Sequence, residues 1–399
     1  MKLMLFFWKS LCNRDEIKPW IYEIIEKKFP RSIKKTRINW SPMIWKKIYL
    51  SFRRWHYHLK LPHFFTVFDF TQIFTTGEEL TCMDVWANYF AVGSNIGKVY
   101  FFTTKSCMKG LFTIHSTTIK ITNIKFWYTN SKDLIAVISL NNQKLEFWDV
   151  INQHKIHNPH EDQPSVSMIS KAHRFFIASN YEIIEYKWIQ SELRKGEKLE
   201  FQPSTNTETG PNLNIFDIFV DQKKMTAIRT NFIHIMVESF EIPTLRTLRF
   251  VNLIDEISTH SIEPERNYNV KCHIPINDVI FMVTDLYFYV ALKLTEHEEH
   301  IWKTYSLSEN LRNNVSSILF YSNIFFYGLR SGSILIYFGK SIFDYLNINL
   351  PTIISKTLNI DTEPITHLNI VESKDSVSLL AMTKYKLHII KFYDILSDA

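Results

Sequence analysis

Beyond about residue 64, short apolar runs recur along the chain and are separated by clusters of Asn, Asp, Gly, Ser or Lys. Runs of this kind, bounded by turn-forming residues, predict many short β-strands. In the clearest unit, residues 80–104, the pattern predicts three strands with a first turn at Ala87-Asn88. Residues 121–150 repeat the same order of strands and turns. The chain therefore carries a repeated sheet-forming unit.

Five weaker copies of this unit follow, over residues 166–188, 215–240, 279–307, 315–338 and 365–393. The spacing is about 40 residues, which is typical of four-stranded propeller blades. A small sheet with two apolar faces cannot bury both alone, whereas radial stacking buries each face against a neighbour. We therefore expect an all-β fold with a small α-helical N-terminal segment, namely a β-propeller of seven blades. The strand predicted over Phe64–Phe74 lies outside the units, and we expect it to pair with the last one and close the ring.

The first 62 residues follow a helical rather than a strand pattern. Apolar residues recur at helical spacing over 8–28 and again over 42–55. Pro19 suits the first turn of a helix, and Pro30 suits a position just beyond its end. The sequence thus predicts two domains, a helical segment over 1–62 and the propeller over 63–399.

The composition of the whole chain favours a sheet-rich protein. Aromatic residues make up 15% of the chain, with 31 Phe, whereas Gly numbers only 9. Aromatic residues suit pleated, half-buried surfaces, and scarce Gly argues against a nucleotide site built on Gly-rich phosphate loops. The four cysteines are scattered without a close pair, which favours reduced thiols. The apolar opening is too short for a signal peptide or a membrane span, so we expect a cytoplasmic or nuclear protein.

Charge is distributed unevenly along the chain. Residues 1–60 hold 15 Lys or Arg against four acids, whereas the chain as a whole has a net charge of only +6. The first 60 residues are therefore basic, and the rest of the chain is acidic overall. Segments of opposite charge are typical of separate modules. The basic residues of 27–60 could contact nucleic acid, but the aromatic residues among them fall on a helical stripe rather than an open platform. We therefore expect neither a nucleic-acid nor a membrane partner.

Candidate catalytic and metal-binding groups do not form a pattern that indicates chemistry. The polar stretch 154–162 is rich in His but lies in a Pro-flanked connector, and 193–212 has the composition of a loop between units. His297 and His300 stand at i, i+3, whereas the zinc-protease helix needs i, i+4. We expect a protein that is not an enzyme and needs no metal or cofactor.

Residues 64–396 resemble the WD-repeat family. Trp148-Asp149 is the dipeptide that names this family, and it ends the second unit. Residues 93–99 and 328–334 resemble the family's "G-S-x-D-G-x-I" hairpin, although Ile96 and Ser331 replace the turn aspartate. The resemblance implies the same propeller that the spacing of the units predicts.

The N-terminal segment resembles the end of an F-box and its linker. Residues 7–15, FWKSLCNRD, match the family phrase "LWK-x-L-C-x-R-D", and residues 45–49 and 53–55 fit the downstream "WK-x-x-Y" and its Arg-rich helix. The family's "LP-x-E" opening and first two helices would precede residue 1. The resemblance therefore covers the last F-box helix and the linker.

An F-box/WD-repeat protein would be the substrate-recognition adaptor of a Skp/cullin/F-box-type ubiquitin ligase, so this resemblance implies a Skp-type adaptor, a cullin and a substrate protein as partners. The alternative is a non-catalytic WD-type scaffold in another complex. By resemblance, Phe7, Trp8 and Leu11 would bind the adaptor. The substrate would dock on exposed turns of the propeller, at Asn88, Asn130, Lys132, Tyr321 and Asn323.

Overall fold

The structure is a computed structural model of the 399-residue chain. It describes residues 2–14, 16–29, 40–58, 63–103, 112–115, 118–158, 165, 167–171, 173–201, 214–220, 224–230, 235–241, 247–252, 270–276, 279–284, 288–293, 302–306, 314–339, 356–372 and 377–392.

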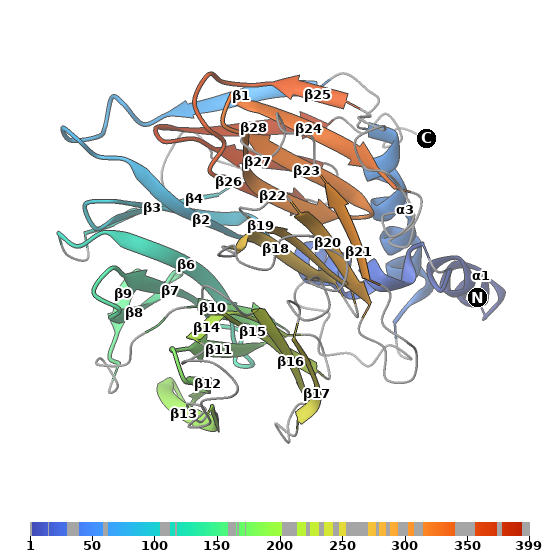
Figure 1. The fold of residues 1–399 in the computed structure, drawn as a ribbon, viewed down its shortest axis with the longest axis horizontal. Coiled ribbons are helices and arrows are strands. Elements are labelled where there is room, and N and C mark those ends of the chain that lie inside the picture. Colours follow the sequence, from blue (N-terminus) through green and yellow to red (C-terminus); the bar gives the residue numbers. More distant parts are fainter. Residues whose placement is uncertain are drawn as a thin grey trace.

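The chain is mostly β, with four-stranded antiparallel sheets arranged like the blades of a propeller (Figure 1). The strands of each sheet follow one another in sequence, except that the first strand joins the last sheet. The sheets are β2 (Leu80–Trp86), β3 (Tyr89–Ser94), β4 (Lys98–Thr103) and β5 (Phe112–His115); β6 (Ile121–Tyr128), β7 (Leu134–Leu140), β8 (Leu145–Asp149) and β9 (His154–Ile156); β10 (Ser167–Lys171), β11 (Arg174–Ala178), β12 (Glu182–Ile189) and β13 (Glu192–Glu200); β14 (Asn214–Val220), β15 (Lys224–Thr230), β16 (Ile235–Glu241) and β17 (Thr247–Asn252); β18 (Val270–Ile276), β19 (Val279–Thr284), β20 (Phe288–Lys293) and β21 (Trp302–Ser306); β22 (Val315–Tyr321), β23 (Ile324–Leu329), β24 (Ser333–Phe338) and β25 (Lys356–Asn359); and β26 (His367–Glu372), β27 (Val377–Met382), β28 (Lys386–Phe392) and β1 (His63–Asp69).

Two junctions between neighbouring sheets are built in the same way, from a Thr or Ser hydroxyl, a Gly and an Ile. The Thr81 hydroxyl of β2 donates to the carbonyl oxygen of Ile121, at the start of the next sheet, over 2.7 Å. A Cβ atom on Gly93 would lie 2.7 Å from Ile121, so the close approach requires glycine. Equivalent contacts join the sheet of β22 to that of β26, through Ser316, Gly328 and Ile365.

The first strand pairs with the last, as the sequence predicts. β1 runs antiparallel to β28, from His63 opposite Phe392 to Asp69 opposite Lys386. The strand ends at Asp69, because the chain turns at Phe70, before the predicted end at Phe74. The innermost strands β26, β2, β6, β10 and β14 lie side by side in that order, and β18 and β22 continue on the other side of β26.

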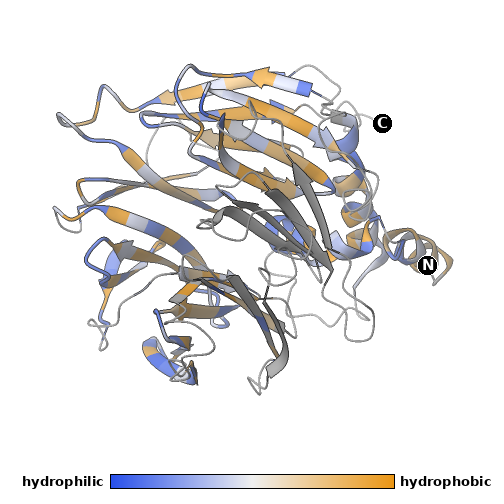
Figure 2. Ribbon diagram, viewed as in Figure 1, coloured by the Kyte–Doolittle hydropathy of each residue, from blue (hydrophilic) through white to orange (hydrophobic). Residues whose placement is uncertain are grey.

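The helices are α1 (Lys2–Cys12), a 3-10 turn (Lys18–Trp20), α2 (Ile21–Lys28) and α3 (Pro42–His58). The predicted helical stretch 8–28 is thus divided, with Pro19 inside the 3-10 turn rather than in the first turn of α2. α2 and α3 lie against the sheets of β22–β25 and β26–β28, while α1 projects from them (Figure 1). Their apolar side chains share one core with these sheets. Figure 2 shows that apolar residues recur along both the helices and these strands. The boundary near residue 62 separates helix from strand, but it does not separate two cores.

Two stretches differ from the expected loops. Residues 192–200 form β13, the outer strand of its sheet, although they were expected to lie in a loop. Residues 154–156, which were expected to lie in a connector, form β9 and pair with β8. Outer strands pair on one side only, and most side chains of β13 are exposed, so it lacks the apolar alternation that marks inner strands. His297 and His300 lie outside the described residues. Within the described part of the chain, none of the helices is long and apolar enough to cross a membrane.

Candidate functional site

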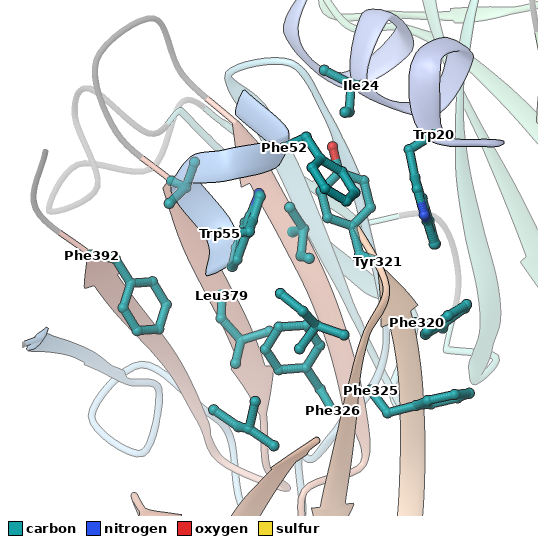
Figure 3. Close-up of a cluster of buried hydrophobic side chains, with 14 of the residues drawn as sticks. Trp20, Ile24, Phe52, Trp55, Phe320, Tyr321, Phe325, Phe326, Leu379 and Phe392 are labelled. Carbon is teal, nitrogen blue, oxygen red and sulfur yellow. The ribbon is translucent and has the colours of Figure 1, made fainter. Parts of the chain in front are cut away.

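The helical segment covers the turn between β22 and β23. Ser322 and Asn323 form this turn with positive φ angles of 51° and 60°, which suits a tight hairpin. The indole N–H of Trp20 donates to Oδ1 of Asn323 over 2.6 Å, and Nδ2 of Asn323 donates to the carbonyl of Glu16 over 3.0 Å. Tyr321, just before the turn, lies between Trp20 and Trp55, with ring centroids 5.6 and 5.7 Å away (Figure 3).

The Glu372 carboxylate, at the end of β26, joins α3 to the propeller. It is buried and accepts hydrogen bonds from the Trp55 indole over 2.9 Å, from the Tyr321 hydroxyl over 2.6 Å and from the Ser51 hydroxyl. The Lys28 ammonium lies 3.8 Å from the same carboxylate. Burial, together with the nearby Glu372 charge, raises the pKa of Tyr321 well above its usual value, so its hydroxyl stays a donor. A buried carboxylate with this many donors fixes the orientation of the helices that supply them.

A cavity of about 210 Å³ lies beneath α2, where the innermost strands β2, β6, β10 and β26 end. Charged side chains of both signs line it, from α2 and from the strands β2, β6 and β10. Lys171 at the end of β10 pairs with Glu23 and, over 2.8 Å, with Glu26. Lys27 reaches the other way, to Asn369 and the carbonyl of Ile370 in β26, each over 3.4 Å. α2 is thus tied to strands on two sides of the cavity.

The Lys171 ion pairs shift the pKa values of both partners. Burial alone would raise the pKa of Glu23, but the neighbouring Lys171 charge outweighs it and lowers the pKa. Burial would likewise lower the pKa of Lys171, but Glu23 and Glu26 together raise it above the usual value. Both groups therefore stay charged at neutral pH, and the pairs stabilise the contact between α2 and β10.

The outer face of α1 is apolar and uncovered. Leu3, Met4, Phe6 and Phe7 are 86%, 67%, 76% and 55% exposed. They lie on successive turns of an 11-residue helix, so their side chains form one continuous patch. We call these four residues the α1 patch. Contiguous exposed apolar surface of this kind marks sites of protein interaction.

The three predicted adaptor residues of α1 differ in their exposure. Phe7 belongs to the α1 patch. Trp8 and Leu11 are half-buried instead, and Trp8 packs against Tyr49 of α3 at 5.7 Å between ring centroids, with the Lys46 ammonium 5.9 Å from the Trp8 ring. The motif resemblance did not identify Leu3, Met4 and Phe6, although Leu3 and Met4 stand four and three residues before Phe7, at helical spacing.

The five predicted substrate-binding residues also divide. Asn88, between β2 and β3, and Asn130 and Lys132, between β6 and β7, are exposed at the surface. Tyr321 and Asn323 are 2% and 0% exposed, because the helical segment covers their turn. Tyr321 and Asn323 therefore do not lie on an exposed turn in this structure, contrary to the expectation from the sequence.

The charged side chains under α2 are engaged mainly with one another and with the backbone. In the part of the chain that the structure describes, no group of three or more His, Cys, Asp or Glu side chains is placed to hold a metal ion. The His, Glu and Lys side chains under α2 are mostly engaged in ion pairs and hydrogen bonds that hold the helix in place.

Comparisons with known proteins bear on the fold alone. No family model matches the chain, and no curated protein matches it in sequence. Among solved structures, it is similar to the crystal structure of the computationally designed Ika8 protein, with a TM-score of 0.51 and 10% sequence identity. The match covers 79% of this chain and 96% of the designed one. At this identity, the similarity concerns the arrangement of the strands.

Proposed function

We propose that this protein is the substrate-recognition adaptor of a Skp/cullin/F-box-type ubiquitin ligase. The α1 patch binds the Skp-type adaptor, and the propeller, with its seven sheets closed into a ring, holds the target protein. The observation that carries the proposal is the uncovered apolar face of α1, on the segment whose sequence resembles the last helix of an F-box.

The attachment of the helices supports this division of labour. An adaptor of this kind raises the effective concentration of a target lysine near the ubiquitin-carrying enzyme, and this effect depends on a defined distance between the two binding surfaces. Glu372 and Lys171 tie α3 and α2 to different sheets. Such ties keep the helical segment at one orientation relative to the propeller.

The target surface proposed for the propeller comprises the turns at Asn88 and at Asn130 and Lys132. These turns join the first and second strands of their sheets, as does the covered turn at Asn323. They therefore lie on the same side of the propeller as the helices but remain exposed. A target bound there would lie beside the helical segment, near the ligase that α1 recruits.

The test is a binding titration of the purified full chain with the Skp-type adaptor of the same organism. We expect Phe6→Glu combined with Phe7→Glu to weaken binding at least tenfold, about 1.4 kcal/mol, because it places charges in an apolar interface. Met43→Glu is the matched control, since Met43 is also an apolar helical residue and is 57% exposed, but lies on α3. The control should bind like the wild-type chain.

The alternative function is a WD-type scaffold in another complex. It is favoured if the wild-type chain shows no binding to the Skp-type adaptor while a stable complex without cullin is recovered from native cells. In that case the glutamate substitutions on α1 should dissociate that other complex. Equal adaptor binding by the α1 variant and the Met43→Glu control would contradict the proposed role of the α1 patch.

A further inference from the structure

The outer edge of the propeller at β1 is apolar and exposed. Phe64, Phe65 and Val67 are 56%, 44% and 45% exposed, so apolar side chains on both faces of this strand reach the surface. Among the described strands, β1 pairs with β28 only. An exposed, apolar strand with one open edge is a ready template for pairing with another chain.

Four other outer strands carry the usual protection against such pairing. β5, β9 and β25 have four, three and four residues. β13 is longer, with nine residues, but six of them are charged. β1 has seven residues, and Asp69 at its end is the only Asp, Glu, Lys or Arg among them. Among these five strands, β1 is the one that is both long and apolar, and it is thus the most open to an added strand.

The direction of the backbone groups decides which residues can pair. The N–H of Phe70 donates to the carbonyl of Tyr385, on the side of β28, over 3.0 Å. Backbone groups alternate along a strand, and the register between β1 and β28 has no shift. The N–H and C=O groups of the even-numbered residues therefore point to β28, and those of Phe65 and Val67 point to the open edge.

The sequence of β1 is complementary to itself when two copies run antiparallel with Thr66 at the centre. Phe65 and Val67, whose backbone groups face outward, then pair with each other across the axis, so the hydrogen-bonding pattern of the two edges matches. Aromatic pairs, aromatic pairs with β-branched residues, and pairs of opposite charge are the favourable cross-strand combinations. This register supplies the first two, placing Phe64 opposite Phe68 and Phe65 opposite Val67, and it brings Asp69 beside His63.

We propose that β1 pairs with β1 of a second copy of this chain, around a two-fold axis at Thr66, and joins two four-stranded sheets into one of eight strands. Charge supports this occupant over an unrelated apolar strand. The Lys356 ammonium lies 3.4 Å from Nδ1 of His63, so the end of the strand that would receive Asp69 of the second copy is positive. Because seven-residue strands form a small interface, we expect a dissociation constant in the micromolar range.

The first test is sedimentation of the full chain at increasing concentration, with Val67→Pro as the variant. Proline removes the outward N–H of residue 67 and none of the bonds to β28, so the monomer should keep its fold. We expect a concentration-dependent dimer for the wild-type chain and a monomer for the variant. Ile73→Ser, which removes an exposed apolar side chain just outside β1, is the control and should dimerise. A monomeric wild-type chain, or a dimer that Val67→Pro leaves intact, would overturn the proposal.

The second test fixes the register and does not depend on the proline variant folding. Thr66 is the one residue that faces itself across the axis, in a pair without mutual hydrogen bonds, where Cα atoms approach to about 4.5 Å. A cysteine there meets the distance that a disulfide requires. Thr66→Cys should give a disulfide-linked dimer under mild oxidation, whereas Phe64→Cys, which faces Phe68, should not. Equal cross-linking of both variants, or of the wild-type chain with its own cysteines, would contradict the register.

Discussion

Helices α1 and α3 are both amphipathic, yet the molecule uses their apolar faces in opposite ways. On α3, Trp45, Ile48, Phe52 and Trp55 are at most 1% exposed, packed on the sheets of β22 and β26. On α1, the α1 patch stays uncovered, and only the opposite side of that helix rests on α3. Apolar periodicity predicts a helix in both cases, but whether its face stabilises the fold or remains for a partner depends on what the rest of the chain places against it.

The largest expected effect comes from breaking the buried face. Trp55 contacts Tyr321, Phe326 and Phe392, at 5.7 to 6.0 Å between ring centroids, and donates to Glu372. Trp55→Ala should lower the free energy of unfolding by about 3–5 kcal/mol, because it removes a fully buried ring. Chemical denaturation measures this loss.

The conservative variant Trp55→Phe separates packing from hydrogen bonding. It keeps most of the ring contacts and removes the indole N–H, so about 1–3 kcal/mol should be lost. If Trp55→Ala costs less than 1 kcal/mol, the attachment of α3 to the propeller is not as described.

Lowering the pH should also destabilise the sheet of β26, which the helices cover, rather than α1. Burial, and to a lesser extent the Lys125 charge, lowers the pKa of His367 in β26 from 6.5 to about 4. The unfolded chain therefore binds a proton at His367 between pH 6.5 and pH 4 that the folded chain does not, so stability falls as pH falls through this window. The loss should amount to about 2–3 kcal/mol.

Comparison with His367→Gln isolates this contribution from other titrating groups. The free energy of unfolding of the variant should depend less steeply on pH between 6.5 and 4 than that of the wild-type chain. Parallel pH profiles for the two proteins would show that His367 is not held neutral by its surroundings.

A smaller effect is expected at the ion pairs of α2. Lys171→Met keeps the aliphatic stem and removes the charge between Glu23 and Glu26, so about 1–2 kcal/mol should be lost, more than for a surface pair and less than for a fully buried one. Denaturation at neutral pH checks the loss. Adding Glu23→Gln should then cost little more, because the two residues act on each other; additive losses would show that they are not coupled.

The smallest effect completes the comparison between the two helices. Phe6→Ala on α1 should change the free energy of unfolding by no more than about 0.5 kcal/mol, because its side chain is 76% exposed. The same denaturation series measures it. A loss comparable to that of Trp55→Ala would mean that the α1 patch is covered in solution.

Sequence patterns predicted local features well. The turn at Ala87-Asn88, the helix from Pro42 and the pairing of the strand near Phe64 with the last unit are all found in the structure. Each depends on residues close together in the sequence or on the repeat itself. Charged outer strands such as β13 were missed, because an edge strand exposed on both faces has no apolar alternation to detect.

The candidate site could be predicted only in part. Phe7 was identified from the motif, but the burial of Tyr321 and Asn323 depends on contacts with Trp20 and Trp55, about 300 positions earlier in the chain. The turn has ordinary hairpin residues, so nothing in its own sequence shows that helices cover it. Long-range packing decides which of several similar turns is left for a partner.

Amide hydrogen exchange of the full chain, with and without the purified Skp-type adaptor, tests most directly whether α1 is the surface left for a partner. We predict that bound adaptor slows exchange over residues 2–12 and leaves exchange over 42–58 unchanged, since α3 is already packed on the propeller. Unchanged exchange over α1 at saturating adaptor, or slowed exchange confined to the propeller strands, would contradict this account.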